Sequence, residues 1–278
     1  MPFPQSAVRH WFAYPNIDPV ALHLGPFSIH WYGISYLFGF LCVFLWMNRP
    51  AARARLGLSG EQIQDFLVYS LLGVLIGGRL FFVFADILSH RNPGYYFFHP
   101  INFIAIWNGG MGFFGGLIGV IIAIAYFARR HSGLTFGALA DEVVVMLPIG
   151  LASTRVVNFI NDELPGDICV PDRPWCIGFP NYYGYRYPSQ LFEGVLDLAV
   201  LPLMLLLARF DLGAGTRAWI WFTCYGLTRS IAEIWRAADI RVGPITGGQL
   251  LSLPMIALGA IMATRSYLLY RRQEASKT

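Results

Sequence analysis

Long apolar runs recur along almost the whole chain, and they constrain its fold more than any other feature. A helix that crosses a bilayer needs about 20 mostly apolar residues. Charged residues make up only 13% of the chain, whereas soluble domains carry about 25%. We therefore expect an all-α membrane protein, a seven-transmembrane-helix bundle that forms a single integral membrane domain over residues 1–278. The expected spans are 28–47, 63–84, 110–128, 137–160, 188–208, 217–235 and 248–270.

The basic residues between these runs predict how the bundle is oriented. Eleven fall on one side of the membrane and six on the other. Because cytoplasmic loops carry the excess of arginine and lysine, we expect a periplasmic N-terminus and a cytoplasmic C-terminus. The larger group is Arg49, Arg53, Arg55, Arg129, Arg130, Arg209, Arg217, Arg265, Arg271, Arg272 and Lys277, and the smaller group is Arg9, Arg91, Arg173, Arg186, Arg236 and Arg241.

Two long segments, about 85–109 and 161–187, fall on the outer side. The second is rich in Pro, Gly and Tyr, and we expect it to form a small periplasmic head. It contains Cys169 and Cys176, which form either a disulfide, favoured by an oxidising compartment, or two free thiols. The chain has no CxxC pair or histidine cluster and no dense basic run, so we expect no metal, no cofactor and no nucleic-acid partner.

Three arginines lie within or at the ends of the apolar runs: Arg79, Arg155 and Arg229. An arginine at the centre of a membrane helix costs roughly 2.5–3.5 kcal/mol on insertion scales, and its charge cannot be shed. Each of the three comes late in a helix that runs outward, so we place them near one level in the outer half of the membrane. They need carboxylate partners, an anionic ligand, or both.

These arginines have two interpretations. They could lock helices together through ion pairs, and Glu233, four residues after Arg229, is placed to pair with it. They could instead form an anion site for a lipid phosphate, which the planar guanidinium can bind with two hydrogen bonds at once. The glycine-rich run 109–119 is compatible with close helix packing and with a cradle for a ligand.

Several short motifs recur in a fixed order along the chain. Taken together, they resemble those of the prolipoprotein diacylglyceryl transferases, from about Pro15 to Tyr270. The most specific run extends from Arg155 through Asn158, Asn161, Glu163 and Gly166. The remaining motifs are HWYG at 30–33, GGR at 77–79, GGM and GG within 109–116, PSQL with Glu at 188–193, YG with Arg at 225–229, Glu and Arg at 233 and 236, and GQ at 248–249.

The resemblance implies a reaction at the outer face of the bacterial inner membrane. Members of this family move the diacylglyceryl group of phosphatidylglycerol, a membrane lipid, to the lipobox cysteine thiol in the signal peptide of a preprolipoprotein, and glycerol phosphate leaves. Their fold is a seven-helix bundle with a periplasmic head. The resemblance implies catalytic roles for Arg155, Arg229 and Tyr32. It implies substrate-binding roles for Arg155, Asn158, Asn161, Glu163, Gly166, Tyr225, Glu233, Arg79, Gln190, Gly115 and Gly116.

The sequence departs from the family pattern at Phe114, where the family usually has a histidine before the second pair of glycines. The usual histidine before PSQL is replaced by Tyr187. Histidine can take a thiol proton near neutral pH, whereas phenylalanine cannot. The histidine could be dispensable here, Phe114 could be an engineered substitution, or the chain could bind lipid without transferring it. His30, at the outer start of the first span, is a possible substitute.

Three functions therefore compete. The first is the transferase. The second is a lipid-binding pseudoenzyme of the same family, which shares the arginines and lacks the base. The third is a transporter or channel, against which the absence of an internal repeat argues. Transfer of a diacylglyceryl group to a lipobox peptide distinguishes the first from the second, and flux in liposomes tests the third.

Overall fold

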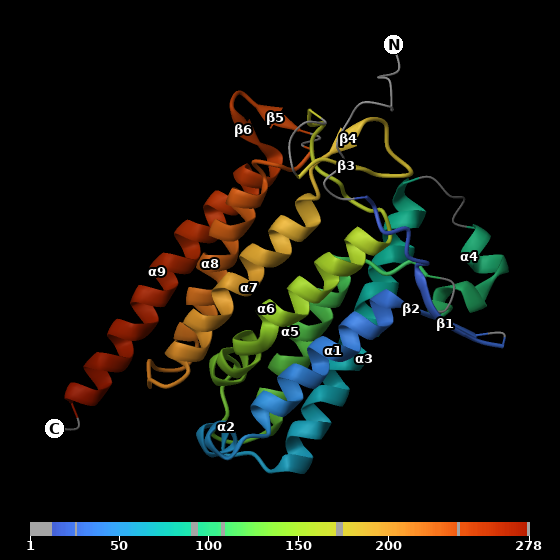
Figure 1. The fold of residues 1–278 in the computed structure, drawn as a ribbon. Coiled ribbons are helices and arrows are strands. Elements are labelled where there is room, and N and C mark those ends of the chain that lie inside the picture. The colour runs from blue at the N-terminus through green and yellow to red at the C-terminus, as the bar shows by residue number, and fades with distance from the viewer. Residues whose placement is uncertain are drawn as a thin grey trace. The chain divides into compact units, whose positions relative to one another are not determined.

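The computed structural model of the protein describes residues 13–25, 27–89, 94–106, 109–170, 175–237 and 240–276. All seven predicted apolar segments contain a helix (Figure 1). Four residues of the topology count, Arg9, Arg91, Arg173 and Lys277, lie outside the described residues. The seven helices are α1 (Trp31–Met47), α3 (Gly60–Ser89), α5 (Phe113–Arg130), α6 (Phe136–Ile160), α7 (Ser189–Leu207), α8 (Thr216–Ala232) and α9 (Gly247–Ala275).

The helix boundaries differ from the predicted ones where polar segments adjoin the apolar runs. Strand β2 (Phe27–His30), which pairs antiparallel with β1 (Val20–Leu24), occupies the start of the first predicted span, so α1 begins only at Trp31. Helix α3 continues past its apolar run at both ends, because helical hydrogen bonding does not require apolar side chains. Three further short helices are α2 (Pro50–Leu56), α4 (Gly94–Phe98) and the 3-10 helix η1 (Pro100–Phe103).

The described helices support a multi-pass membrane protein. Five of them, α3, α5, α6, α7 and α9, are long and apolar enough to cross a bilayer. A sixth span is possible if α1 and α2, which meet at a bend of 79°, count as one. Helix α8 has only 17 residues and contains Arg217 and Arg229. Seven spans therefore stay a prediction.

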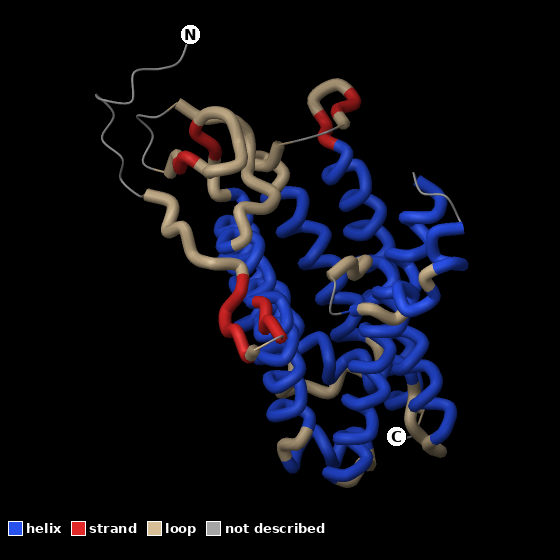
Figure 2. Tube along the Cα trace, turned by 90° about the vertical axis from the view of Figure 1, so that its right-hand side faces the viewer, coloured by secondary structure: helices blue, strands red, loops and turns tan. Residues whose placement is uncertain are grey.

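The chain divides into two compact units, and the first comprises Met1–Val43 and Asp141–Thr278. Helices α7, α8 and α9 of this unit lie side by side (Figures 1 and 2). Small residues allow close approach between helices, as Gly194 of α7 does against the Arg155 side chain of α6. A Cβ atom on Gly194 would lie 3.3 Å from the Cβ of Arg155.

The predicted head segment 161–187 contains a short hairpin of β3 (Ile177–Gly178) and β4 (Tyr185–Arg186), and a disulfide joins Cys169 to Cys176. A second hairpin, β5 (Arg241–Val242) and β6 (Ile245–Thr246), precedes α9. Figure 2 shows both hairpins at one end of the helices of this unit, away from the C-terminal end of α9. This end also holds the last turns of α6 and α8 and the first turn of α7.

The second unit comprises Phe44–Ala140, and its core is the contact between α3 and α5. Glycines on the two helices face each other, Gly73 against Gly119 and Gly77 against Gly115. A Cβ on Gly115 would lie 2.7 Å from the Gly77 carbonyl carbon, which is closer than van der Waals contact allows. The glycine-rich run therefore serves helix packing at Gly115, and its role as a ligand cradle stays a prediction.

Adjacent glycines of α5 provide a test of this packing. We expect Gly115→Ala to destabilise the protein by roughly 1–3 kcal/mol, because overpacking forces the two backbones apart. Gly116→Ala should be neutral or stabilising, since its Cβ would meet Val74 only at 3.6 Å and alanine favours a helix. Thermal melting of the two purified variants in detergent measures both effects. Equal melting temperatures would contradict the assignment.

Candidate active site

One buried glutamate on α7 holds three arginines together. The Glu193 carboxylate is 2% exposed. Its Oε1 atom lies 2.8 Å from Arg155 of α6 and 3.4 Å from Arg229 of α8, and its Oε2 atom lies 3.4 Å from Arg236, which follows α8. Arg155 and Arg229 thus share one anion, which explains how they can be neighbours despite their like charges.

Glu233 is the second carboxylate of this cluster. Its Oε1 atom lies 2.6 Å from Arg229 and 3.7 Å from Arg236. The pair four residues apart that the sequence predicts is therefore confirmed. Burial, and then the neighbouring charge of Arg229, lower the pKa of Arg236, as expected where guanidinium groups crowd together.

The ion-paired groups of this arginine cluster are unequal in number, three guanidiniums against two carboxylates. The arginine side chains are 17–22% exposed, whereas both glutamate side chains are only 3% exposed. Asp197, on the next turn of α7 after Glu193, makes no ion pair among the described residues, and its Oδ2 atom is buried without a hydrogen-bond partner. The more exposed groups of the ion-paired cluster are therefore its three guanidiniums, which suits an anionic ligand.

A hydrogen-bond network adjoins the arginine cluster. The Tyr32 hydroxyl of α1 donates to Glu163 Oε2, and Asn158 Nδ2 donates to the Tyr32 oxygen at 2.5 Å and to Glu163 Oε2 at 3.0 Å. Asn161 donates to Glu163 Oε1 at 3.3 Å. Arg155 donates to Asn158 Oδ1 at 3.3 Å and so connects this network to the arginine cluster. The structure thus brings together five of the residues named by the resemblance.

The backbone turn after α6 is held by hydrogen bonds from the first two residues of α7. Asp162 and Leu164 both have φ of +55°, a left-handed conformation that costs free energy in residues other than glycine. Gln190 donates from Nε2 to the Glu163 carbonyl at 2.5 Å, and Ser189 donates to the Leu164 carbonyl at 3.1 Å. Gln190 therefore holds the backbone of Glu163, while a contact of Gln190 with substrate stays a prediction.

Gly166 lies where three segments meet. Its amide donates to the Tyr187 carbonyl at 2.8 Å, and it forms an isolated bridge with Arg236. A Cβ atom here would overlap the Trp235 carbonyl and come within 2.9 Å of the Tyr187 carbonyl. Only glycine allows this approach, which fixes the backbone that carries Arg236.

Tyr225 of α8 stacks on Trp221 with ring centroids 5.4 Å apart and interacts electrostatically with Arg155, Glu193 and Arg229. It therefore belongs to the surroundings of the arginine cluster. His30, the possible substitute base, is exposed at the end of β2.

The remaining predicted residues belong to the second unit. Arg79 is 6% exposed and donates to the carbonyls of Asn102, Phe103, Gly109 and Gly110 at 2.5–3.2 Å. It thus organises the loop before α5. Phe114, in the first turn of α5, is 61% exposed and lies against Phe81 with ring centroids 6.0 Å apart. Arg79 belongs to the second unit, so its predicted position at one level with Arg155 and Arg229 stays a prediction.

Sequence reasoning assigned no site role to two members of the cluster. Glu193 and Arg236 appear only in the motifs at 188–193 and 233–236 and, for Arg236, in the charge count of the outer side. Their spacing carried a signal, because Arg236 is three residues after Glu233 and therefore on the same face of a helical turn. Among the described residues, no group of three or more His, Cys, Asp or Glu side chains could hold a metal.

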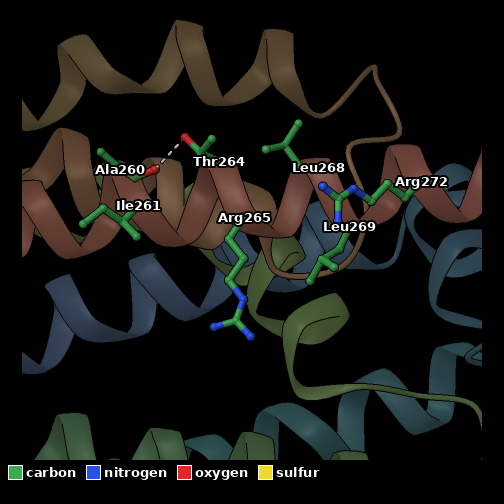
Figure 3. A pocket seen from close by; sticks show the side chains of 7 residues that line it. All are labelled: Ala260, Ile261, Thr264, Arg265, Leu268, Leu269 and Arg272. Carbon is green, nitrogen blue, oxygen red and sulfur yellow. Dashed lines mark hydrogen bonds between the residues drawn. The ribbon is translucent and has the colours of Figure 1, made fainter.

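An open groove along the C-terminal half of α9 is separate from this cluster (Figure 3). Every residue that lines it comes from one helix, including Ile261, Arg265 and Arg272. The Thr264 hydroxyl donates to the Ala260 carbonyl at 2.8 Å. The groove is lined by a single helix, whereas the arginine cluster combines residues of α6, α7 and α8.

The Glu193 interactions predict a large effect of one substitution. Glu193→Gln keeps the volume but removes the anion shared by three arginines, so we expect a loss of roughly 3–5 kcal/mol in the free energy of unfolding. Asp167→Asn is the matched control, because its pair with Arg241 is about half exposed and such pairs contribute about 0–1 kcal/mol. Thermal melting in detergent compares the two, and similar shifts would contradict the central role of Glu193.

Comparisons with known proteins show the family to which this chain belongs. The family model described as prolipoprotein diacylglyceryl transferase matches residues 19–265, which include the whole cluster and network. A phosphatidylglycerol–prolipoprotein diacylglyceryl transferase of Geobacter sulfurreducens is 41% identical over 90% of this chain and 95% of its own length. Proteins of the same name from Chromobacterium violaceum and Sodalis glossinidius are 38% and 37% identical, covering 90% and 96% of this chain and 95% and 99% of their own lengths. The chain belongs to the prolipoprotein diacylglyceryl transferase family.

Proposed function

We propose that this protein transfers the diacylglyceryl group from phosphatidylglycerol to the lipobox cysteine thiol of a preprolipoprotein and releases glycerol phosphate. The observation that carries the proposal is that the guanidiniums of Arg155, Arg229 and Arg236 are partly exposed and are held together by two buried carboxylates. Membership of the family supports the same activity.

The reaction forms one carbon–sulfur bond and breaks one carbon–oxygen bond. The sulfur attacks the glyceryl carbon that bears the phosphate, and the electron pair of the broken bond stays on the phosphate oxygen. Negative charge therefore grows on the phosphate in the transition state. Arginines that are already fixed by Glu193 and Glu233 stabilise this charge without reorganising, which is the main source of electrostatic catalysis.

The attacking sulfur must lose its proton, because the thiolate is the nucleophile. Glu163 is the carboxylate that adjoins the arginine cluster through Asn158 and Arg155. It receives hydrogen bonds from Tyr32, Asn158 and Asn161, which orient it. We assign the thiol proton to Glu163, so the histidine that Phe114 replaces is dispensable in this chain.

The proposed topology has seven spans, a periplasmic N-terminus and a cytoplasmic C-terminus in the inner membrane. Arg155 and Arg229 lie in the last two turns of α6 and α8, and Glu193 lies near the start of α7. These helix ends are at the end of the first unit that bears the β3–β4 and β5–β6 hairpins. The opposite end of α9 carries Arg271 and Arg272. The positive-inside rule therefore supports a cytoplasmic C-terminus, with the site and the head segment 161–187 toward the periplasm.

The arginine substitutions test the proposed phosphate site. We expect Arg155→Ala and Arg229→Ala each to lower kcat/KM by roughly 10²-fold or more, the size of a lost oxyanion-type contact. The assay measures diacylglyceryl thioether formed from phosphatidylglycerol and a lipobox peptide. Arg241→Ala is the control, because its side chain is 53% exposed and pairs with Asp167. Unchanged activity in a folded Arg155 or Arg229 variant would refute the site. Lipid binding without transfer in the wild type would instead indicate the pseudoenzyme.

The proton acceptor is tested by a pair of variants. Glu163→Gln should lower kcat by roughly 10²–10⁴-fold, the usual contribution of a general base. Phe114→His should change kcat by less than about tenfold, since the proton already has an acceptor. A gain of roughly 10²-fold or more in Phe114→His would show that the missing histidine limits the rate and would overturn the assignment to Glu163. Steady-state kinetics on both variants decide between the two.

A further inference from the structure

The Glu233 carboxylate has a second partner on a different element. Glu233 follows the last turn of α8 and is 4% exposed. Its Oε1 atom binds Arg229 at 2.6 Å, and its Oε2 atom accepts a hydrogen bond from the Thr246 hydroxyl at 2.8 Å. The two carboxylate oxygens therefore have different partners. This arrangement prevents the carboxylate from rotating to accept hydrogen bonds from two nitrogen atoms of one guanidinium.

Thr246 is also the N-cap of α9, and this second role directs its hydroxyl. Its Oγ1 atom accepts the Gln249 amide at 3.1 Å, and the Gln249 side chain accepts the Thr246 amide at 3.1 Å, forming a capping box. A hydroxyl has one proton to donate. With its oxygen held by the cap, that proton is directed to Glu233.

The first turn of α9 is shaped around the same carboxylate. A Cβ atom on Gly248 would overlap the Glu233 carboxylate and lie 2.7 Å from its Oε2 atom. Glycine is otherwise unfavourable in a helix by about 1 kcal/mol relative to alanine. Thr246 is 5% exposed, so water does not replace its hydrogen bond. Two adjacent features of α9 thus accommodate Glu233.

We propose that Thr246 is a positioning residue for the lipid phosphate site. By holding Oε2 of Glu233, it limits this glutamate to one hydrogen bond with Arg229 and leaves for the phosphate the donors of Arg229 that neither Glu233 nor Glu193 occupies. Without Thr246, the carboxylate can rotate into a bidentate pair with Arg229, the favoured geometry of such pairs. This inference rests on the proposed function, because it takes the phosphate of phosphatidylglycerol as the ligand.

The test uses the full chain in proteoliposomes that contain phosphatidylglycerol, with a lipobox peptide as acceptor. Thr246→Val should lower kcat/KM by roughly 10-fold or more, the effect of a lost charge-assisted hydrogen bond. Thr246→Ser should stay within about threefold of the wild type. Thr246→Asp keeps a good N-cap but places a second carboxylate against Glu233, so it should also lose activity.

The control removes a cap that touches no carboxylate in the described structure. Thr135 precedes α6 and accepts the Ala138 amide at 3.1 Å, so Thr135→Val loses a similar bond. It should lower the melting temperature and leave kcat/KM unchanged. Wild-type kcat/KM in Thr246→Asp would mean that Thr246 only caps α9, and this result would overturn the proposal.

A stability measurement separates this proposal from the proposed function. In a double-mutant cycle of Thr246→Val and Glu233→Met, the two effects on melting should be non-additive, because both variants remove the same hydrogen bond between Thr246 and Glu233. Additive effects would show that Thr246 and Glu233 are not coupled, and this result would overturn the proposal whatever the activity. Non-additive effects in a protein that transfers no lipid would refute the proposed function, and with it the phosphate role of Thr246, while the contact itself would be supported.

Discussion

The ion pairs of Glu193 are the interactions on which the rest of the site depends. Three guanidiniums within reach of one carboxylate repel one another, and each loses hydration when it enters the protein. A single buried anion offsets part of both costs and joins α6, α7 and the segment after α8. The same contact that stabilises this end of the first unit therefore also creates the site, because it fixes the arginines before any lipid binds.

Arg79 shows a second solution to the same problem. Its guanidinium donates to the backbone carbonyls of Asn102, Phe103, Gly109 and Gly110, which supply partial negative charge without a carboxylate. These hydrogen bonds go to the protein's own backbone, so Arg79 organises a loop. Arg155 and Arg229 differ from Arg79, because they pair with carboxylates and are partly exposed. The number of buried arginines in a sequence therefore says less about function than the kind of partner each one finds.

The helices could be predicted because bilayer thickness imposes a length that a linear sequence displays directly. The shared ion pairs of Glu193 and Arg236 could not be predicted for the opposite reason, since they arise from contacts between helices that spacing along one chain does not show. Counting charges placed Arg236 on the outer side, whereas in the structure its backbone bridges Gly166 and its guanidinium pairs with Glu193. Likewise, the glycines of α5 allowed two roles until the carbonyl of Gly77 was found against Gly115.

The pairing of the arginines also bears on release of the product. Phosphatidylglycerol has a phosphodiester with one negative charge, whereas the released glycerol phosphate is a monoester with a charge of about −1.5 to −2, like other phosphate monoesters at pH 7. Unpaired arginines would bind this product more tightly than the substrate and slow turnover. Glu193 and Glu233 compete for the same donors and weaken binding of both anions. Since catalysis requires tighter binding of the transition state than of either ground state, arginines shared with carboxylates suit this reaction better than free ones.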